Sequence, residues 1–187
     1  MFRKYLGKSR LEQLPSPMFS VTVDIVSGGR VVRVTGDSTR SILESINVPG
    51  LSTPIIGEGQ ALVDGGLVNN IPADVLVSKG CNFVIASSVT AKLEREFVGI
   101  RADQDNQKPK KPSALKAMMR GYLVQNYNMN SVGVQPADYV IEPDVTAFDL
   151  SEFERADEMA AVGRKATHEV LSSIKEQLSK LDNGLFP

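Results

Sequence analysis

The carboxylate of Asp64 is the side chain whose sequence neighbours best suit a catalytic role. Asp64 ends the apolar run Ala61–Val63 and is followed at once by Gly65 and Gly66. Burial would raise the pKa of this acid, so we expect it to be hydrogen-bonded or paired. The glycines lack a Cβ atom, which lets the chain bend sharply and lets another backbone or a substrate approach closely. Asp-Gly is also a common turn dipeptide, so the spacing allows a plain turn as well as a catalytic site.

Other reactive side chains are few. His168 is the only histidine, which excludes multi-histidine metal sites and leaves any Ser-His-Asp triad dependent on it. It lies in an amphipathic segment, where a surface position or one at the edge of the core is expected, and we assign it no catalytic role. Cys81 is the only cysteine, so no internal disulfide forms, and its apolar context predicts a buried structural thiol. No second carboxylate or histidine stands near Asp64 at ligand spacing, and we expect neither a metal nor a cofactor.

The elements before this acid are predicted from apolar periodicity. Residues 20–37 alternate apolar and polar side chains around Gly28-Gly29, which predicts a β-hairpin. A short helix is expected next, capped by Ser38 or Thr39 and ended by Pro49-Gly50. Its apolar residues are Ile42, Leu43 and Ile46.

The elements around the acid predict an α/β fold. A strand ends at Asp64, a helix runs from about Pro72 to Lys79 with Asn70 as its N-cap, and the apolar run Phe83–Val89 is typical of a strand buried on both faces. This order predicts a βαβ unit with a parallel sheet around Ala61–Val89. Ligands of open α/β sheets bind beyond the carboxyl ends of the strands, which is where the acid would lie.

The second half of the chain has fewer chemical signals. Residues 101–113 lack apolar periodicity and contain two prolines and three lysines, which predicts a mobile surface loop. Helical spacing follows over residues 113–129, and a short strand precedes Pro143. The last segment predicts a long C-terminal helix, with Ser151 and Glu154 at the spacing of a capping box.

The whole chain has the composition of one soluble domain, residues 1–187. Apolar residues make up 42% and charged residues 23%, and the net charge of −1 implies neither nucleic acid nor an anionic membrane surface as a partner. The basic N-terminus has no apolar segment typical of a secretory signal, and no stretch approaches a membrane span. We therefore expect a cytoplasmic protein with at most peripheral membrane contact, for which Lys108, Lys110 and Lys111 are the weak candidates.

Three segments together resemble a known family. "INVPGLSTPI", "LVDGGLVNNIPADVLVSKG" and "FVIASSV" resemble the second half of a patatin-like phospholipase domain. The Asn-Asn-x-Pro-Ala-Asp continuation is most similar to the bacterial and neuropathy-target-esterase-like branch. Asp-Gly-Gly alone is a weak signal, whereas its combination with the Pro-Gly segment and Asn-Asn-x-Pro is fairly specific.

The resemblance implies a fold and a chemistry. It implies part of a three-layer α/β fold with a mainly parallel sheet. It also implies a lipid acyl hydrolase with a Ser-Asp dyad, in which the aspartate accepts the proton of the serine and helps to activate water. Asp64 matches the dyad aspartate, and Gly65 and Gly66 match the turn that supports it. The scarcity of histidine fits such a dyad, and the implied substrate is a phospholipid, a lysophospholipid or a related ester.

The family's nucleophile is missing from the sequence. No Gly-x-Ser-x-Gly occurs in the 187 residues, and the glycine-rich oxyanion loop is absent as well. The nearest string, "GDSTR", has Arg40 in place of the second glycine, and we reject Ser38 as a nucleophile. We therefore expect the chain to be inactive alone and to pair with the N-terminal half of the domain or with another copy. The alternative is a non-catalytic interaction or regulatory module on the same scaffold.

Overall fold

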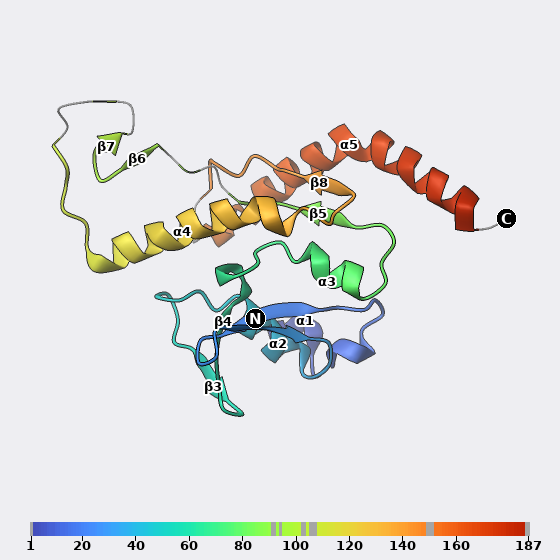
Figure 1. Cartoon of the computed structure of the whole chain (residues 1–187), viewed down its shortest axis with the longest axis horizontal. Coiled ribbons are helices and arrows are strands. Elements are labelled where there is room, and N and C mark those ends of the chain that lie inside the picture. Colours follow the sequence, from blue (N-terminus) through green and yellow to red (C-terminus); the bar gives the residue numbers. More distant parts are fainter. Residues whose placement is uncertain are drawn as a thin grey trace. The chain divides into compact units, whose positions relative to one another are not determined.

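The computed structural model describes residues 2–90, 93, 95–101, 104, 108–148 and 152–185 (Figure 1). By their contacts the residues form two compact units, one of Met1–Asn70 with Lys111–Asn126 and the other of Ile71–Lys110 with Tyr127–Pro187. Each unit is described by itself, and the expectation of one domain over 1–187 stays a prediction.

A four-stranded sheet with the order β2-β1-β4-β3 forms the centre of the first unit. Its strands are β1 (Ser20–Asp24), β2 (Gly29–Arg33), β3 (Ile55–Gly57) and β4 (Gln60–Asp64). The hairpin predicted over residues 20–37 is confirmed, and Gly28 supplies the positive φ of its turn, at 74°. All three pairings in this sheet are antiparallel, which differs from the mainly parallel sheet that we expected. For β1–β2 and β3–β4 the reason is local, because connections this short can join only antiparallel strands, whereas β1 and β4 pair across a long stretch of chain.

Helix α2 (Ser38–Ser45) packs on β1 and β4 with an unexpected face. Asp37, not Ser38 or Thr39, is its N-cap and accepts a hydrogen bond from the backbone N–H of Arg40 at 2.7 Å. The buried face of the helix is polar, whereas Leu43 and Ile46 are exposed. The prediction of the helix was therefore right, and the prediction of its cap was wrong. Two further helical turns precede the sheet, α1 (Phe2–Leu6) and the 3₁₀ turn η1 (Leu11–Gln13).

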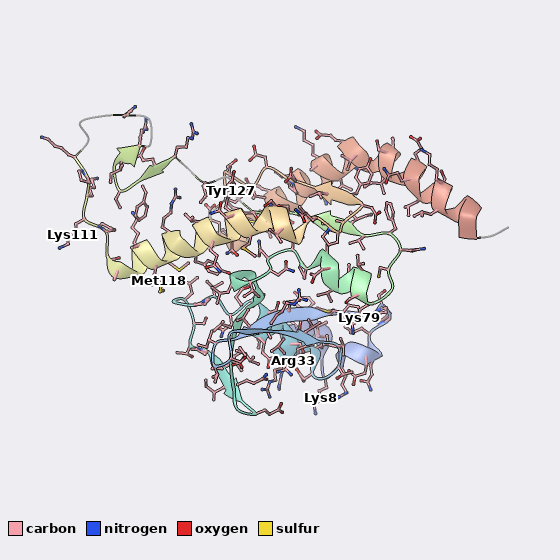
Figure 2. The ribbon with its side chains drawn as sticks, viewed as in Figure 1. Lys8, Arg33, Lys79, Lys111, Met118 and Tyr127 are labelled. Carbon is pink, nitrogen blue, oxygen red and sulfur yellow. The ribbon has the colours of Figure 1, made fainter. Side chains whose placement is uncertain are left out.

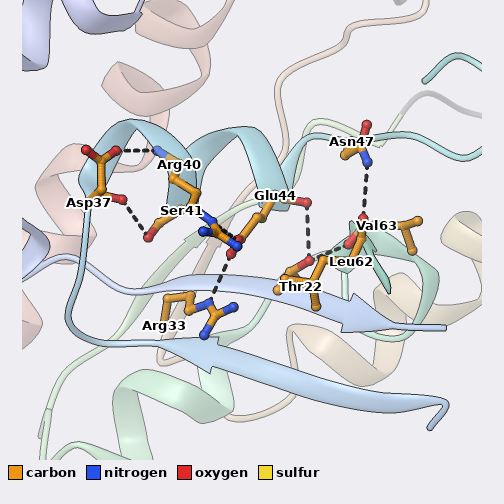
Figure 3. A network of polar contacts seen from close by, with 9 residues as sticks. All are labelled: Thr22, Arg33, Asp37, Arg40, Ser41, Glu44, Asn47, Leu62 and Val63. Carbon is orange, nitrogen blue, oxygen red and sulfur yellow. Dashed lines mark hydrogen bonds and ion pairs between the residues drawn. The ribbon is translucent and has the colours of Figure 1, made fainter. Parts of the chain in front are cut away.

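Glu44 explains why this polar face can be buried (Figure 3). Its carboxylate is 1% exposed and accepts hydrogen bonds from Nε of Arg33 at 3.0 Å and from Nε of Arg40 at 2.8 Å. A buried charge is tolerated when it is paired and hydrogen-bonded in this way. Beside it, the Thr22 hydroxyl lies 3.2 Å from the Glu44 carbonyl and 2.5 Å from that of Val63, which links helix α2 to β1 and β4.

The second unit contains a parallel pair of strands and a long helix. β5 (Ile85–Ser87) pairs in parallel with β8 (Tyr139–Ile141), and α5 (Ala156–Leu185) contacts β8. The other elements are α3 (Ala73–Ser78), the two-residue strands β6 (Glu96–Phe97) and β7 (Ile100–Arg101), and the 3₁₀ turn η3 (Phe153–Arg155). Helix α4 (Ala114–Gly133) has residues in both units. The mixed α/β class, a parallel strand pair and the long C-terminal helix are thus confirmed.

The predicted strand–helix–strand order around Ala61–Val89 is present as β4, α3 and β5, but its strand pairing differs. β4 and β5 belong to different sheets, and the parallel partner of β5 is β8, which a local pattern does not reveal. In place of a strand buried on both faces, β5 buries Ala86 between exposed neighbours, as its two-stranded sheet allows.

Two smaller expectations were wrong, and a third is not tested. The N-cap of α3 is Pro72 and not Asn70. Cys81 is exposed, because it lies just beyond the C-terminal end of α3. The capping box at Ser151 and Glu154 falls partly outside the described residues, and α5 itself begins at Ala156 after η3.

The predicted loop at 101–113 is described only in part. Residues 101, 104 and 108–113 carry no helix, and Lys108, Lys110 and Lys111 are exposed. The backbone N–H of Lys110 donates to the carbonyl of Val98 at 2.8 Å. Residues 102, 103 and 105–107 lie outside the described part, so the mobility of this loop stays a prediction. Within the described residues, no helix is both long and apolar enough to cross a membrane.

Candidate active site

Asp64 is the last residue of β4, where the strand meets a 3₁₀ turn. Its backbone pairs with Thr22 on β1, and its N–H donates to the carbonyl of Asn47 at 3.0 Å. Oδ1 of Asp64 accepts a hydrogen bond of 2.7 Å from the N–H of Gly66, so Asp64 caps the turn η2 (Gly65–Leu67). The carboxylate thus has the partner that the sequence required. The side chain is half-buried, which leaves part of it accessible.

Gly65 is needed because a backbone passes against it. A Cβ atom at this position would lie 2.8 Å from the carbonyl carbon of Val21 and closer still to the carbonyl oxygen. Its φ is not in the left-handed region, so the requirement comes from packing and not from backbone conformation. The end of β4 that carries Asp64 therefore packs closely against β1.

Gly66 is needed for a different reason, because polar side chains converge on it. A Cβ atom there would lie 2.8 Å from Oη of Tyr122, 3.1 Å from Oδ1 of Asn126 and 3.1 Å from Oδ1 of Asp64. Tyr122 and Asn126 are four residues apart on α4 and so lie on one face of that helix. The glycine is therefore the common neighbour of the carboxylate, a phenol and an amide.

The surroundings of Asp64 raise its pKa. Burial is the largest influence on Asp64 and raises its pKa, whereas hydrogen bonds from the Gly66 N–H and the Tyr122 hydroxyl lower it. Burial likewise raises the pKa of Tyr122 to about 12, with a further contribution from the charge of Asp64. The phenol is therefore protonated at neutral pH and acts as a donor. A half-buried carboxylate with a raised pKa is suited to accept a proton from a nucleophile.

Asn126 completes the cluster. It is 6% exposed, and its hydrogen bond to Tyr122 lowers the pKa of the phenol, as a donor to the phenol oxygen does. In the part of the chain that the structure describes, its Oδ1 atom has no hydrogen-bond partner. A buried acceptor beside a carboxylate is a place for a donor such as a hydroxyl or a water molecule.

The sequence predicted a helix over residues 113–129, which includes Tyr122 and Asn126, but it singled out neither residue. The available signal was the spacing of four between two polar-tipped residues on one helix face. Their contact with Asp64 has no local signature, because α4 follows β4 only after a long stretch of chain.

The other candidates do not form a second site. His168 is exposed on α5. Ser38 is fully buried, and its Oγ donates to the carbonyl of Ser9 at 2.8 Å, which fits the rejection of Ser38 as a nucleophile. Among the described residues, no cluster of three His, Cys, Asp or Glu side chains could hold a metal ion.

Comparison with known proteins decides the family relationship. An NTE family protein of Mycobacterium tuberculosis is 26% identical over 188 residues, which cover 90% of this chain and 31% of that protein. Lysophospholipase NTE1 of Kluyveromyces lactis is 24% identical over 94% of the chain and 13% of its own length. The chain is a homologue of the NTE-type, patatin-like phospholipases. The resemblance carried by the Asp-Gly-Gly and Asn-Asn-x-Pro motifs is thereby confirmed.

The share of the chain that is matched differs between the relatives. Patatin-like phospholipase domain-containing protein 7 of the mouse is 35% identical over 90 residues, which cover 47% of this chain and 7% of that protein. The chain spans less than a third of the length of the mycobacterial relative. No protein-family model matches the chain.

Proposed function

We propose that Asp64 is the base of a Ser-Asp dyad in a lipid acyl hydrolase, and that the serine lies outside these 187 residues. The observation that carries the proposal is the half-buried Asp64 carboxylate, raised in pKa and fixed by Gly66 at the end of β4. Its setting in a homologue of lysophospholipases and phospholipases supports the same role. A plain turn accounts for the Gly66 hydrogen bond, but it does not account for the phenol and the amide gathered at the same point.

The proposed reaction has two half-reactions. The serine oxygen attacks the ester carbonyl while Asp64 takes the serine proton, and the tetrahedral intermediate then expels the alcohol, which receives that proton. Asp64 next accepts a proton from water, whose oxygen attacks the acyl-serine. The fatty acid leaves, and the proton returns to the serine oxygen. No cofactor is required, because the carboxylate carries each proton.

The missing groups define what must be supplied from elsewhere. The 187 residues contain neither the nucleophile elbow with its serine nor the oxyanion loop with its backbone donors. Each such donor stabilises the transition state by about 3 kcal/mol. We propose that these come from an N-terminal half of the domain or from a second chain, and that the 187 residues alone hydrolyse no ester. The non-catalytic alternative is not favoured, since a named lysophospholipase is among the homologues.

The substrate class follows from the relatives and not from a pocket. We propose a lysophospholipid, a phospholipid or a related ester, approached from a membrane surface. Lys108, Lys110 and Lys111 are exposed and would give weak, salt-sensitive contact with anionic head groups. Nucleic acid is not a proposed partner, because the net charge is −1.

The test uses the protein in its source cells, so that any companion segment or chain is present. Lysates from cells that carry the wild type, Asp64→Ala or Glu169→Gln are assayed for lysophospholipid hydrolysis and for labelling by a fluorophosphonate. Asp64→Ala should abolish both signals, whereas Glu169→Gln, an exposed change on α5, should leave both intact. If no serine associated with the chain is labelled and Asp64→Ala leaves hydrolysis intact, the module is non-catalytic and the proposal fails.

A further inference from the structure

The turn after Asp64 is tied to α4 by more than one contact. Nε2 of Gln125 donates a hydrogen bond to the carbonyl oxygen of Leu67, within η2. One turn away on the same helix, the Tyr122 hydroxyl lies at Gly66 and hydrogen-bonds the Asp64 carboxylate. The start of α4 also approaches this unit, because a Cβ atom at Gly50 would lie 3.3 Å from Cδ1 of Leu115. Helix α4 thus contacts the turn after Asp64 through Tyr122 and Gln125, and the loop at Gly50 through Leu115.

From this geometry we infer that Tyr122, held by Asn126, is a positioning residue that fixes the Asp64 carboxylate for its role as a base. The inference rests on the proposed function of Asp64. It gives a function to α4, a helix that lies outside the segments that resemble the patatin-like family.

The need for a second donor follows from the shape of a carboxylate. The Gly66 N–H binds Oδ1 alone, and a carboxylate held by one hydrogen bond can still rotate about its Cβ–Cγ bond. A donor from α4 restricts that rotation. Catalytic groups lose rate when they stray from the productive geometry, so such restriction is useful to a base.

The chemical type of the donor matters as well. A Lys or Arg beside Asp64 would pair with the carboxylate, lower its pKa by roughly 1–3 units and weaken it as a base. The phenol is neutral, because its pKa is raised to about 12, so it orients the carboxylate without neutralising it. Burial, Gly66 and Tyr122 are the causes of the shift at Asp64, with no charged side chain among them. On the neighbouring strand β1, the residue paired with Asp64 is the uncharged Thr22.

Asn126 gives the phenol its direction. Its amide donates to the phenol oxygen, which leaves the hydroxyl proton to point at Asp64. Asn126 is nearly fully buried and lies four residues from Tyr122, so both side chains lie on one face of the helix. Asn126 therefore orients the Tyr122 hydroxyl, and this hydroxyl orients the Asp64 carboxylate, without transfer of a proton between them.

The experiment compares Tyr122→Phe with Tyr127→Phe, which makes the same change on the same helix at a side chain that is 47% exposed (Figure 2). The first readout is the pKa of Asp64, measured in the 187-residue chain by ¹³C NMR of labelled aspartate. Tyr122→Phe should raise this pKa, since a donor to the carboxylate is lost. Asn126→Ala should shift it in the same direction by less, and Tyr127→Phe should leave it unchanged. Circular dichroism checks that each variant is folded.

The second readout is the pH profile of ester hydrolysis by the protein in its source cells. In Tyr122→Phe, kcat should fall about 10- to 100-fold, the range for loss of one hydrogen bond to a charged group, while KM changes little. The acid limb of the profile should move to higher pH in parallel with the NMR value. A purely structural role for Tyr122 would lower the amount of folded protein without moving the limb.

The two readouts separate the two claims. An unchanged Asp64 pKa in folded Tyr122→Phe overturns the inference, even where Asp64→Ala abolishes hydrolysis. An unchanged acid limb overturns it as well. A raised pKa together with full activity of Asp64→Ala overturns the proposed function instead, because Tyr122 would then orient a carboxylate that is not the base.

Discussion

The Cα atom of Gly65 lies so close to β1 that a Cβ atom there would come within 2.8 Å of the carbonyl carbon of Val21. Real Cβ atoms do not approach other atoms this closely, and the nearest atoms here belong to the backbone of Val21 and not to the end of a flexible side chain. β1 and β4 are hydrogen-bonded neighbours in the central sheet, so one of them must shift if the glycine is replaced. The position of Asp64 therefore depends on the absence of a side chain at the next residue.

Gly65→Ala should lower the free energy of unfolding by about 1–3 kcal/mol, the usual cost of overpacking a closed site. Urea denaturation followed by circular dichroism measures the effect. The matched control is Gly121→Ala on α4, where the new methyl group would meet nothing within 4 Å. This control should raise helix stability by about 0.5–1 kcal/mol, because alanine favours the helix. Equal effects at the two positions would contradict the packing argument.

Gly66 and Tyr122 should be energetically coupled. A methyl group at position 66 would lie 2.8 Å from the Tyr122 hydroxyl, and this hydroxyl can be removed without changing the ring. Gly66→Ala should therefore destabilise the wild type by more than it destabilises Tyr122→Phe. A double-mutant cycle on the free energy of unfolding measures the difference, with about 0.5–1 kcal/mol expected for residues in contact. Additive effects would show that the two positions do not meet.

The sequence predicts those parts of the unit that depend on neighbouring residues. The Gly28-Gly29 turn and the alternation around it predict the β1–β2 hairpin, and Asp64 with two glycines predicts a capped turn. The face of α2 was not predictable in this way. Ser38, Thr39, Ser41 and Glu44 face the sheet, because two arginines neutralise Glu44, and one of them comes from β2. Apolar periodicity does not register a buried polar face.

Long-range contacts account for most of the rest. β5 finds its parallel partner in β8, and the phenol at Asp64 comes from α4, in both cases across a long intervening stretch. Each partner has an ordinary local pattern, and nothing in that pattern identifies what it meets. The family motifs indicate Asp64 because they preserve its local turn. They are silent on Tyr122 because its helix lies outside them.

The buried Glu44 should make its arginines cooperative in stability. Arg33→Met or Arg40→Met leaves one partner in place, whereas the double variant leaves a carboxylate that is 1% exposed without a counter-charge. We expect the double variant to lose about 3–5 kcal/mol of unfolding free energy at neutral pH, more than the sum of the single losses. Chemical denaturation of the three variants measures this. Lys180→Met, which breaks an exposed pair with Glu176, should leave the unfolding midpoint unchanged. Simple additivity of the two arginine substitutions would contradict the shared-charge explanation.

Asp24 and Asp64 should affect stability with opposite dependence on pH. Hydrogen bonds, first from the Ala61 N–H and then from the Ser27 hydroxyl, lower the pKa of Asp24 to about 2 from its usual 3.8. Asp24 therefore stabilises the fold above pH 3.8, and this contribution is lost as the pH falls toward 2. The pKa of Asp64 is raised by burial, so its ionisation costs stability as the pH rises above 3.8.

Asp24→Asn should lower the melting temperature at neutral pH and flatten its decline in acid. Asp64→Asn should instead raise the melting temperature at neutral pH relative to the wild type, and this gain should vanish near pH 3. Thermal unfolding between pH 2 and 8 tests both signs, and a melting temperature that Asp64→Asn lowers at neutral pH would contradict a carboxylate held at a cost in stability.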